Sequence, residues 1–306
     1  MAIATGTVPQ YILEDEDQVS HRNLAWKKFS RHRLALAGAV VLLIFVLAAL
    51  LAKWIAPFDP AAIDDAWQGA AMAPGWHNHL LGTDEIGRDM LSRLMYGGQI
   101  SLTLAVVAMS IEVVVGTIIG AFAGFFGGWI DWALMRVTDI FLSIPLLPLL
   151  LVLTGIVAAT SSKASLSFFY IALIIGLLSW TTVARLVRGA FLSLREKEFC
   201  EAARAIGSKN TSIMFKHLLP NAVAPIIVQA TLDVAGIIIL ESALSFLGFG
   251  IQPPTASWGS MLANAQENML SAPWVGIFPG LCIFVTVLAI NYIGDGLRDA
   301  LDPNVE

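Results

Sequence analysis

Long apolar runs separated by short polar segments dominate this 306-residue chain, and they constrain its fold more than any other feature. A helix needs about 20 apolar residues to cross the hydrocarbon core of a bilayer. Charged residues make up 13% of the chain, about half the usual share in soluble domains. We therefore expect an all-α, multi-pass membrane protein with six transmembrane helices. The runs place these spans at 34–56, about 99–125, 131–160, 168–187, 222–248 and 273–294.

The N-terminal region is polar, and its charge changes sign along the sequence. Residues 1–20 contain an acidic cluster at 14–17 and are predicted to be disordered. From Arg22 to Arg33, apolar side chains alternate with basic ones, which favours a helix on the membrane surface. A solvated positive flank that only sets orientation explains the same pattern equally well. The run at 34–56 is too long and too far from the N-terminus for a signal-peptide core, so we interpret it as an uncleaved anchor.

Residues 57–97 form the first polar excursion. A helix is predicted after Thr83, because acidic residues follow at once and apolar residues then recur at helical spacing. Gly97 and Gly98 are predicted to end it. Within this excursion, residues 76–79 carry two histidines, which are more often solvated loop residues than metal ligands.

Small residues and prolines give two of the spans a distinct character. Gly116, Gly120 and Gly124 recur at every fourth position of the second span, a spacing that lets another helix approach closely. Pro145 and Pro148 are predicted to bend the third span.

Lysine and arginine placement predicts the orientation of the chain. With the N-terminus inside and six spans, fourteen of the eighteen Lys and Arg residues fall on the inner side. This bias places both termini and the long polar segment 188–221 in the cytoplasm.

Five charged residues fall within the predicted spans, where ionisable groups are costly and usually face a cavity or a partner. Arg136 and Asp139 are three positions apart and are predicted to form a structural ion pair. Glu112, Asp233 and Glu241 have no basic residue nearby in the sequence. We expect these three acids to line an aqueous translocation path, unless they lie shallower than the runs suggest.

The sequence carries no motif for catalysis or for cofactor binding. It has no Gly-Lys dipeptide and thus no phosphate-binding loop, and it lacks the HExxH and GxSxG patterns. Its two cysteines, Cys200 and Cys282, form neither a metal-binding spacing nor a disulfide framework. We therefore expect no enzyme activity, no bound metal or cofactor, and no nucleic-acid partner.

The polar segment 188–221 is predicted to form a helical elbow. Gly207 suits a left-handed cap for a first helix, Ser208 suits the N-cap of a second, and Pro220 is expected to end that second helix near Leu219. The first helix has one apolar face, suited to docking into a groove on a partner. Its residues are Phe199, Ala202, Ala203 and Ile206.

The same segment resembles the coupling loop of the integral membrane subunits of ABC importers. The resemblance rests on Glu201-Ala202-Ala203, on Gly207 and on a Leu219-Pro220 ending, with His217 where many members have Ile. Three further segments, at 80–97, 244–262 and 294–303, are similar to the dipeptide/oligopeptide/nickel permease family, in particular to its second permease subunits. The similarity extends from the anchor to the C-terminus.

The resemblance implies a type I ABC-importer permease fold in a prokaryotic inner membrane, with a cytoplasmic coupling helix between spans 4 and 5. Its expected regions are an inner tail (1–33), an anchor (34–56), an outer loop (57–97), a five-span transmembrane domain (98–297) and a C-terminal tail (298–306). The residues implied in docking to the ATPases are Glu201, Ala202, Ala203, Ile206, Gly207, Leu219 and Pro220.

The implied partners are a second homologous permease, two cytoplasmic ATPase subunits that bind the ATP, an extracytoplasmic substrate-binding protein, and membrane lipid. The implied substrate is a dipeptide or oligopeptide, with nickel or a nickel chelate as the alternative within the family. A proton-coupled secondary transporter is an alternative of another class, but the sequence shows no internal repeat of the kind it would need. A receptor or scaffold is a third, and the outer segments are too small for a sensor domain.

Overall fold

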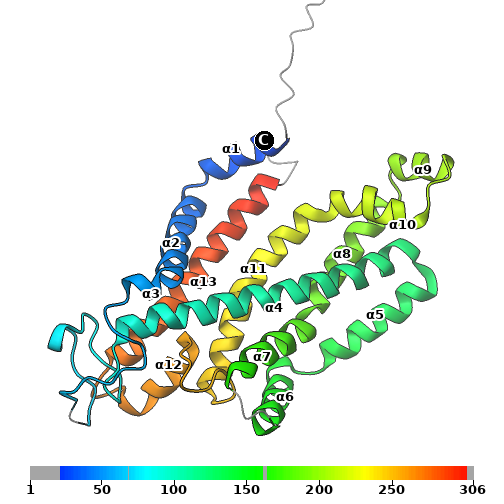
Figure 1. The fold of residues 1–306 in the computed structure, drawn as a ribbon. Helices are drawn as coiled ribbons and strands as arrows, with labels where there is room; N and C mark the ends of the chain where they lie inside the picture. The colour runs from blue at the N-terminus through cyan, green and yellow to red at the C-terminus, as the bar shows by residue number, and fades with distance from the viewer. Residues whose placement is uncertain (1–20, 68, 161–163, 302–306) are drawn as a thin grey trace, which may run out of the picture.

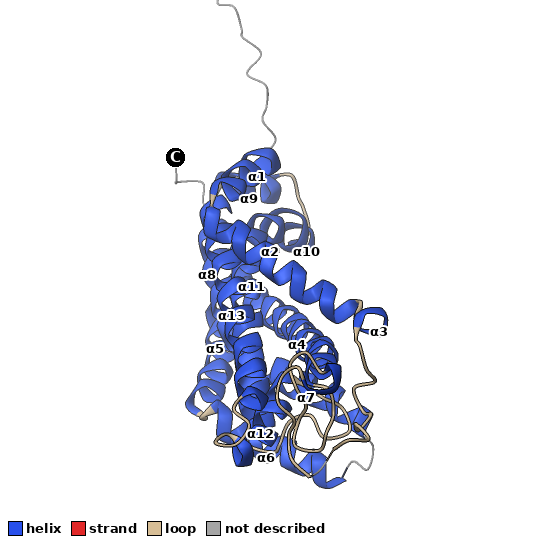
Figure 2. Cartoon of the chain, turned by 90° about the vertical axis from the view of Figure 1, so that its left-hand side faces the viewer, coloured by secondary structure: helices blue, strands red, loops and turns tan. Residues whose placement is uncertain are grey.

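The computed structural model describes residues 21–67, 69–160 and 164–301, and within them the chain is helical, with two isolated bridges and no strand. The tail 1–20, most of the short link near residue 162 and the last five residues fall outside the described part, as do the predictions made for them. The α1 and α9 helices lie at one end of the elongated bundle, and the outer loop and α12 lie at the other (Figures 1 and 2).

The described chain contains thirteen α-helices, two 3₁₀ turns and one π-helical turn. The helices are α1 His21–Arg31, α2 Arg33–Leu50, α3 Ala52–Ile55, α4 Met90–Phe126, α5 Gly128–Ser143, α6 Leu146–Thr160, α7 Ala164–Ser179, α8 Thr181–Leu194, α9 Glu198–Ala205, α10 Asn210–Ser212, α11 Leu219–Phe246, α12 Trp258–Ala265 and α13 Trp274–Leu301. The turns are 3₁₀ at Trp76–Asn78 and Gln266–Asn268, and π-helical at Ile213–Leu218.

Four helical stretches of the described chain are long and apolar enough to cross a membrane alone, and the number rises to six if each of two bent pairs is one span. The single stretches are Arg33–Leu50, Met90–Phe126, Asn210–Phe246 and Trp274–Leu301. The α5/α6 pair bends by 82° and the α7/α8 pair by 42°. The first break lies at Ile144 and Pro145, as the proline predicted, whereas Pro148 is accommodated in the first turn of α6.

The α4 helix begins later and runs further than the sequence predicts. Residues 83–89 are not helical: the Asp84 carboxylate accepts bonds from the backbone N–H groups of Ile86 and Arg88, which holds a turn. Asp89 then caps the helix by accepting from the Ser92 N–H at 2.7 Å. Gly97 and Gly98 do not end it, because they provide room for the ring of Trp258 to pack against the helix.

The glycine stripe of α4 packs closely on α8, as its spacing predicts. A Cβ added at Gly116 would lie 2.6 Å from the Val183 side chain, and one at Gly124 would lie 2.6 Å from that of Phe191. Since real Cβ contacts are not that short, these glycines are required for the two helices to lie at this distance.

The polar segment 188–221 is more helical than predicted. The α8 helix continues to Leu194, and the chain from Asn210 runs without a break through the π-helical turn into α11. Pro220 therefore does not end the second helix, contrary to the prediction. It lies directly after the π-helical turn, at the start of α11, and the Leu219 N–H bonds five residues back to the Met214 carbonyl.

Candidate functional site

Two helix breaks meet at one open cavity of about 420 Å³. The α4 and α11 helices form one side of it. The ends of α5 and α6 and the junction of α7 with α8 form the rest. Irregular backbone at membrane depth is tolerated where it is covered by protein or lines an aqueous cavity, and both breaks satisfy this condition here. The polar and break residues that line the cavity are Glu112, Ile144, Pro145, Ser179, Thr181, Thr182 and Asp233.

Glu112 from α4 and Asp233 from α11 both line this cavity, and their carboxyl groups lie close to each other. Glu112 is 2% exposed. The Gln229 amide donates to one oxygen of Asp233 at 2.8 Å, but Glu112 Oε2 and Asp233 Oδ2 are buried without a hydrogen-bond partner. No Lys, Arg or His is among the described residues that line the cavity. The structure thus brings together two of the three acids predicted to line a path.

Glu241, the third acid, does not line this cavity, contrary to the expectation that the three acids share one path. Its side chain is 0% exposed and accepts hydrogen bonds from three serine hydroxyls on α4, on α11 and before α12. The distances are 3.3 Å from Ser101, 2.7 Å from Ser245 and 2.7 Å from Ser257. A carboxyl group enclosed in this way is a packing element that joins three helices.

The predicted ion pair between Arg136 and Asp139 is also absent. Asp139 instead pairs with Arg185 of α8 at 2.6 Å, and the Arg136 guanidinium lies 5.6 Å from the ring centre of Trp132. Asp139 therefore pairs with an arginine from another helix, and not with Arg136 of its own helix. Nearby, Arg188 binds both oxygens of Asp131, which fastens α8 to α5 a second time.

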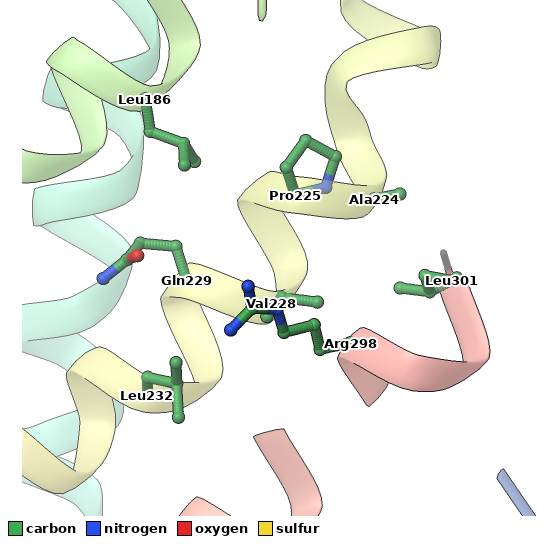
Figure 3. A pocket seen from close by; sticks show the side chains of 8 residues that line it. All are labelled: Leu186, Ala224, Pro225, Val228, Gln229, Leu232, Arg298 and Leu301. Carbon is green, nitrogen blue, oxygen red and sulfur yellow. The ribbon is translucent and has the colours of Figure 1, made fainter. Parts of the chain in front are cut away.

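A second cavity of about 410 Å³ lies between α8, α11 and α13 (Figure 3). In Figure 3 the Arg298 guanidinium extends from α13 toward α11. Leu232 lines both cavities, and Gln229 lines this one while binding Asp233, which lines the other. The two cavities are therefore neighbours along α11, and this one lies closer to the end of the bundle that carries α1 (Figure 1).

The elbow predicted around Gly207 exists, with a different apolar face. Gly207 has φ of 78°, and the N–H of Ser208 bonds to the Ala203 carbonyl at 3.0 Å, so α9 ends in the glycine cap that the sequence predicted. Ser208 does not cap the next helix, which starts after Lys209 without a side-chain cap. The α9 helix lies at the end of the bundle that also carries α1 (Figure 1).

The residues of α9 divide into a buried and an exposed set. Cys200 and Ala203 pack on Ile213 and Met214 within the protein, so Ala203 does not belong to a free docking face. Ile206 is 83% exposed, and Phe199 and Phe215 are exposed as well. Glu201, Ala202, Gly207 and Pro220 are exposed as well, and Leu219 is partly buried. The result is an exposed apolar surface at the tip of the elbow.

The outer loop holds a polar network that sequence reasoning missed. His79, expected to be solvated, is buried, and its ring lies 2.8 Å from the Asp89 carboxylate and 3.0 Å from that of Asp64. The N–H of Ala66 and the His79 ring hold the pKa of Asp64 below its usual value. No described group of three or more His, Cys, Asp or Glu side chains is placed to hold a metal ion. The histidine is thus a structural link between two carboxylates.

Comparison with known proteins identifies the family to which the chain belongs. The family of the inner membrane component of binding-protein-dependent transport systems matches residues 116–306, and the N-terminal transmembrane domain of oligopeptide transport permease C matches residues 20–74. The chain belongs to this family of importer permeases. Its function is therefore that of a transport subunit, not of a catalytic enzyme.

Similar curated proteins cover almost the whole permease. The dipeptide transport permease DppC of Alkalihalophilus pseudofirmus is 38% identical over 95% of this chain and 93% of its own. The oligopeptide permease OppC of Haemophilus influenzae is 39% identical over 94% and 91%, and the glutathione permease GsiD of Escherichia coli is 38% identical over 92% and 90%. These relatives show an ABC-importer permease of the dipeptide/oligopeptide type.

A solved structure shares the fold of the permease. The inward-facing methionine ABC transporter MetNI superposes with a TM-score of 0.54 at 22% identity, covering 70% of this chain and 98% of the matched one.

Proposed function

We propose that this permease is a transmembrane subunit of an ATP-driven importer of dipeptides or oligopeptides, and that it forms the path with a second, homologous permease. The observation that carries the proposal is similarity to peptide permeases over more than nine-tenths of both chains. A nickel substrate is not proposed, because these relatives are named for peptides and the described cavity offers two carboxylates with no imidazole or thiolate.

Each bent helix pair is proposed to act as one span, which gives six. Basic residues gather at the end of the bundle that holds α1 and α9, whereas the outer-loop end carries few of them. Positive charge on cytoplasmic segments is the usual bias, so this end is proposed to face the cytoplasm of a prokaryote, with both termini inside.

The exposed surface of α9 is proposed to dock into a groove on a cytoplasmic ATPase subunit, which binds and hydrolyses the ATP. Ala202 and Ile206 offer small and branched apolar contacts, and Glu201 lies beside them, exposed on the same short helix. Buried Ala203 and Cys200 fix α9 on the turn that leads into α11. Since α11 carries Asp233, movement of α9 would be transmitted to the cavity wall. An extracytoplasmic binding protein is proposed to deliver the peptide.

The coupling role is tested by Gly207→Pro. Proline fixes φ near −65°, which is incompatible with the 78° found at Gly207, so the α9 cap is lost. We expect peptide uptake by the complete importer to fall about tenfold or more, with unchanged insertion of the permease in the membrane, and less ATPase to co-purify.

Gly189→Ala is the matched control. Gly189 lies within α8 and an added Cβ there meets nothing within 4 Å, so uptake should stay at the wild-type level. Wild-type uptake by the Gly207→Pro importer would refute the coupling role. Uptake of nickel, with no uptake of labelled dipeptides or oligopeptides, would refute the proposed substrate.

A further inference from the structure

The Glu112–Asp233 pair is the one site in the described chain where buried acidic oxygens from two helices lack partners and face a cavity. Two like charges close together at membrane depth are unfavourable. No described basic side chain of this permease lines the cavity to neutralise them. Among the described residues nothing else offsets this charge, so a proton or a cation bound in the cavity has to do so.

The shape and chemistry of the cavity favour an organic cation over a metal ion. A volume of about 420 Å³ falls in the range of pockets that hold small organic ligands. Calcium and magnesium take six or more oxygen ligands, whereas two carboxylates are present and the remaining polar groups are hydroxyls. Apolar side chains cover most of the wall, among them Leu178, Ile237 and Leu240.

An ammonium group matches the free acceptors. It has three donors and no acceptor. Glu112 Oε2 and Asp233 Oδ2 offer two unpartnered acceptors, and Ser179, whose hydroxyl oxygen is also buried without a partner, offers a third on the α7/α8 break. The Gln229 amide occupies the other oxygen of Asp233, which orients that carboxylate.

We propose that Glu112 and Asp233 bind the α-ammonium group of a peptide as it passes through the membrane, an inference that rests on the proposed function. The apolar wall then accommodates the side chains of the peptide. The cavity wall is uncharged apart from these two acids. The site therefore recognises the N-terminal ammonium group that all peptides share and does not select among peptide side chains.

The first test uses the complete importer with its wild-type sequence and a hydrophobic carbodiimide, a reagent that modifies carboxyl groups buried in membranes. Modified residues are identified by mass spectrometry after incubation with alanyl-alanine, with N-acetyl-alanyl-alanine, or with Ni²⁺ alone. We expect alanyl-alanine to slow modification of Glu112 and Asp233 several-fold and the other two probes to have no effect. Glu241, enclosed by serines, serves as the internal control in the same digest.

Equal protection by both peptides, or protection by neither, would overturn the proposal, and protection by Ni²⁺ alone would assign the site to a metal ion. A second measurement applies if the reagent reaches neither residue. The double variant Glu112→Gln/Asp233→Asn keeps the side-chain shapes and should reduce dipeptide uptake about tenfold or more, since a charge-assisted hydrogen bond is lost, while ATP hydrolysis stimulated by the loaded binding protein persists. The exposed Glu267→Gln is its control.

Wild-type uptake by the double variant would overturn the ammonium site and leave the proposed function intact. Failure of the wild-type importer to take up any peptide would instead overturn the proposed function.

Discussion

Glu241 and the Glu112–Asp233 pair are both buried acidic sites reached from α11, yet their surroundings are opposite. Both oxygens of Glu241 accept hydrogen bonds, and its side chain lines neither of the two cavities described above. One oxygen of Glu112 and one of Asp233 have no partner, and both residues line a cavity. Depth in the membrane therefore does not identify a transport residue. The supply of hydrogen-bond donors distinguishes the two sites.

The donors around Glu241 are themselves held in place. Each serine hydroxyl that donates to Glu241 also accepts a backbone N–H, and the donors of these bonds are Trp258, Ile251 and Ser260. The network thus satisfies backbone groups at the start of α12 and in the loop before it. A buried polar network stabilises a fold only if every member is paired. The members of this network are paired, which explains why an acid at this position can be purely structural.

Replacing Glu241 by Leu should have the largest effect on folding. The substitution leaves three buried hydroxyls without their acceptor, and each buried polar group left unpaired costs about 1–3 kcal/mol. We expect severe loss of thermal stability of the purified permease, measured by the fraction that remains monodisperse after heating in detergent.

Glu112→Leu is the matched change at the other site. Because no described donor is lost and a desolvated charge is removed, its stability should equal or exceed the wild-type value. If both variants lose stability equally, the contrast between the two acids is not real.

Replacing His79 by Ala should have an intermediate effect. The ring links Asp64 to Asp89 and packs on Phe58, with ring centres 4.3 Å apart. Its removal leaves two carboxylates facing a void, for a loss of about 2–3 kcal/mol. His77→Ala is the control, since that ring is half exposed and lies 3.7 Å from Asp64, beyond hydrogen-bond distance. Thermal unfolding of the two variants should differ by several degrees, and equal melting temperatures would show that the network does not stabilise the loop.

Local patterns predicted the parts of this permease that depend on neighbours in sequence. The Gly116 stripe and the Gly207 cap follow from spacing and from backbone preference, and both predictions are confirmed. Pro145 likewise marked one helix break. The break at Trp180 carries no comparable signal in the sequence.

Long-range partners explain the failures. Glu241 is satisfied in part by Ser101, 140 residues away, and Asp139 by Arg185, 46 residues away. Neither partner can be chosen from sequence spacing. One signal was present: Ser245 lies four residues after Glu241, and Gln229 four residues before Asp233, each on the same helical face as its acid.

The smallest predicted effect concerns two carboxyl groups of the outer loop, Asp64 and Glu85. They show the same contrast between a partnered and an unpartnered acid, but outside the spans. Asp64 is fully partnered, and the Ala66 N–H together with the His79 ring lowers its pKa. Glu85 has a buried oxygen without a partner, and burial, with the nearby Asp84 charge, raises its pKa. The two carboxyls should therefore contribute to pH-dependent stability with opposite signs.

For Asp64, whose folded-state pKa lies below the unfolded value of about 3.9, the stabilisation is present above that value and is lost as the pH falls through the folded pKa. For Glu85, whose folded-state pKa lies above about 4.3, the favourable contribution is present below that value and is lost as the pH rises through the folded pKa.

Melting temperatures measured from pH 3 to 7 should show that Asp64→Asn flattens the decline at the acid end. Glu85→Gln should raise stability at the neutral end, because an uncharged amide avoids the cost of burying a carboxylate. Shifts of the same sign in both variants would show that hydrogen-bond satisfaction does not govern these acids, and would weaken the same argument for Glu112 and Asp233.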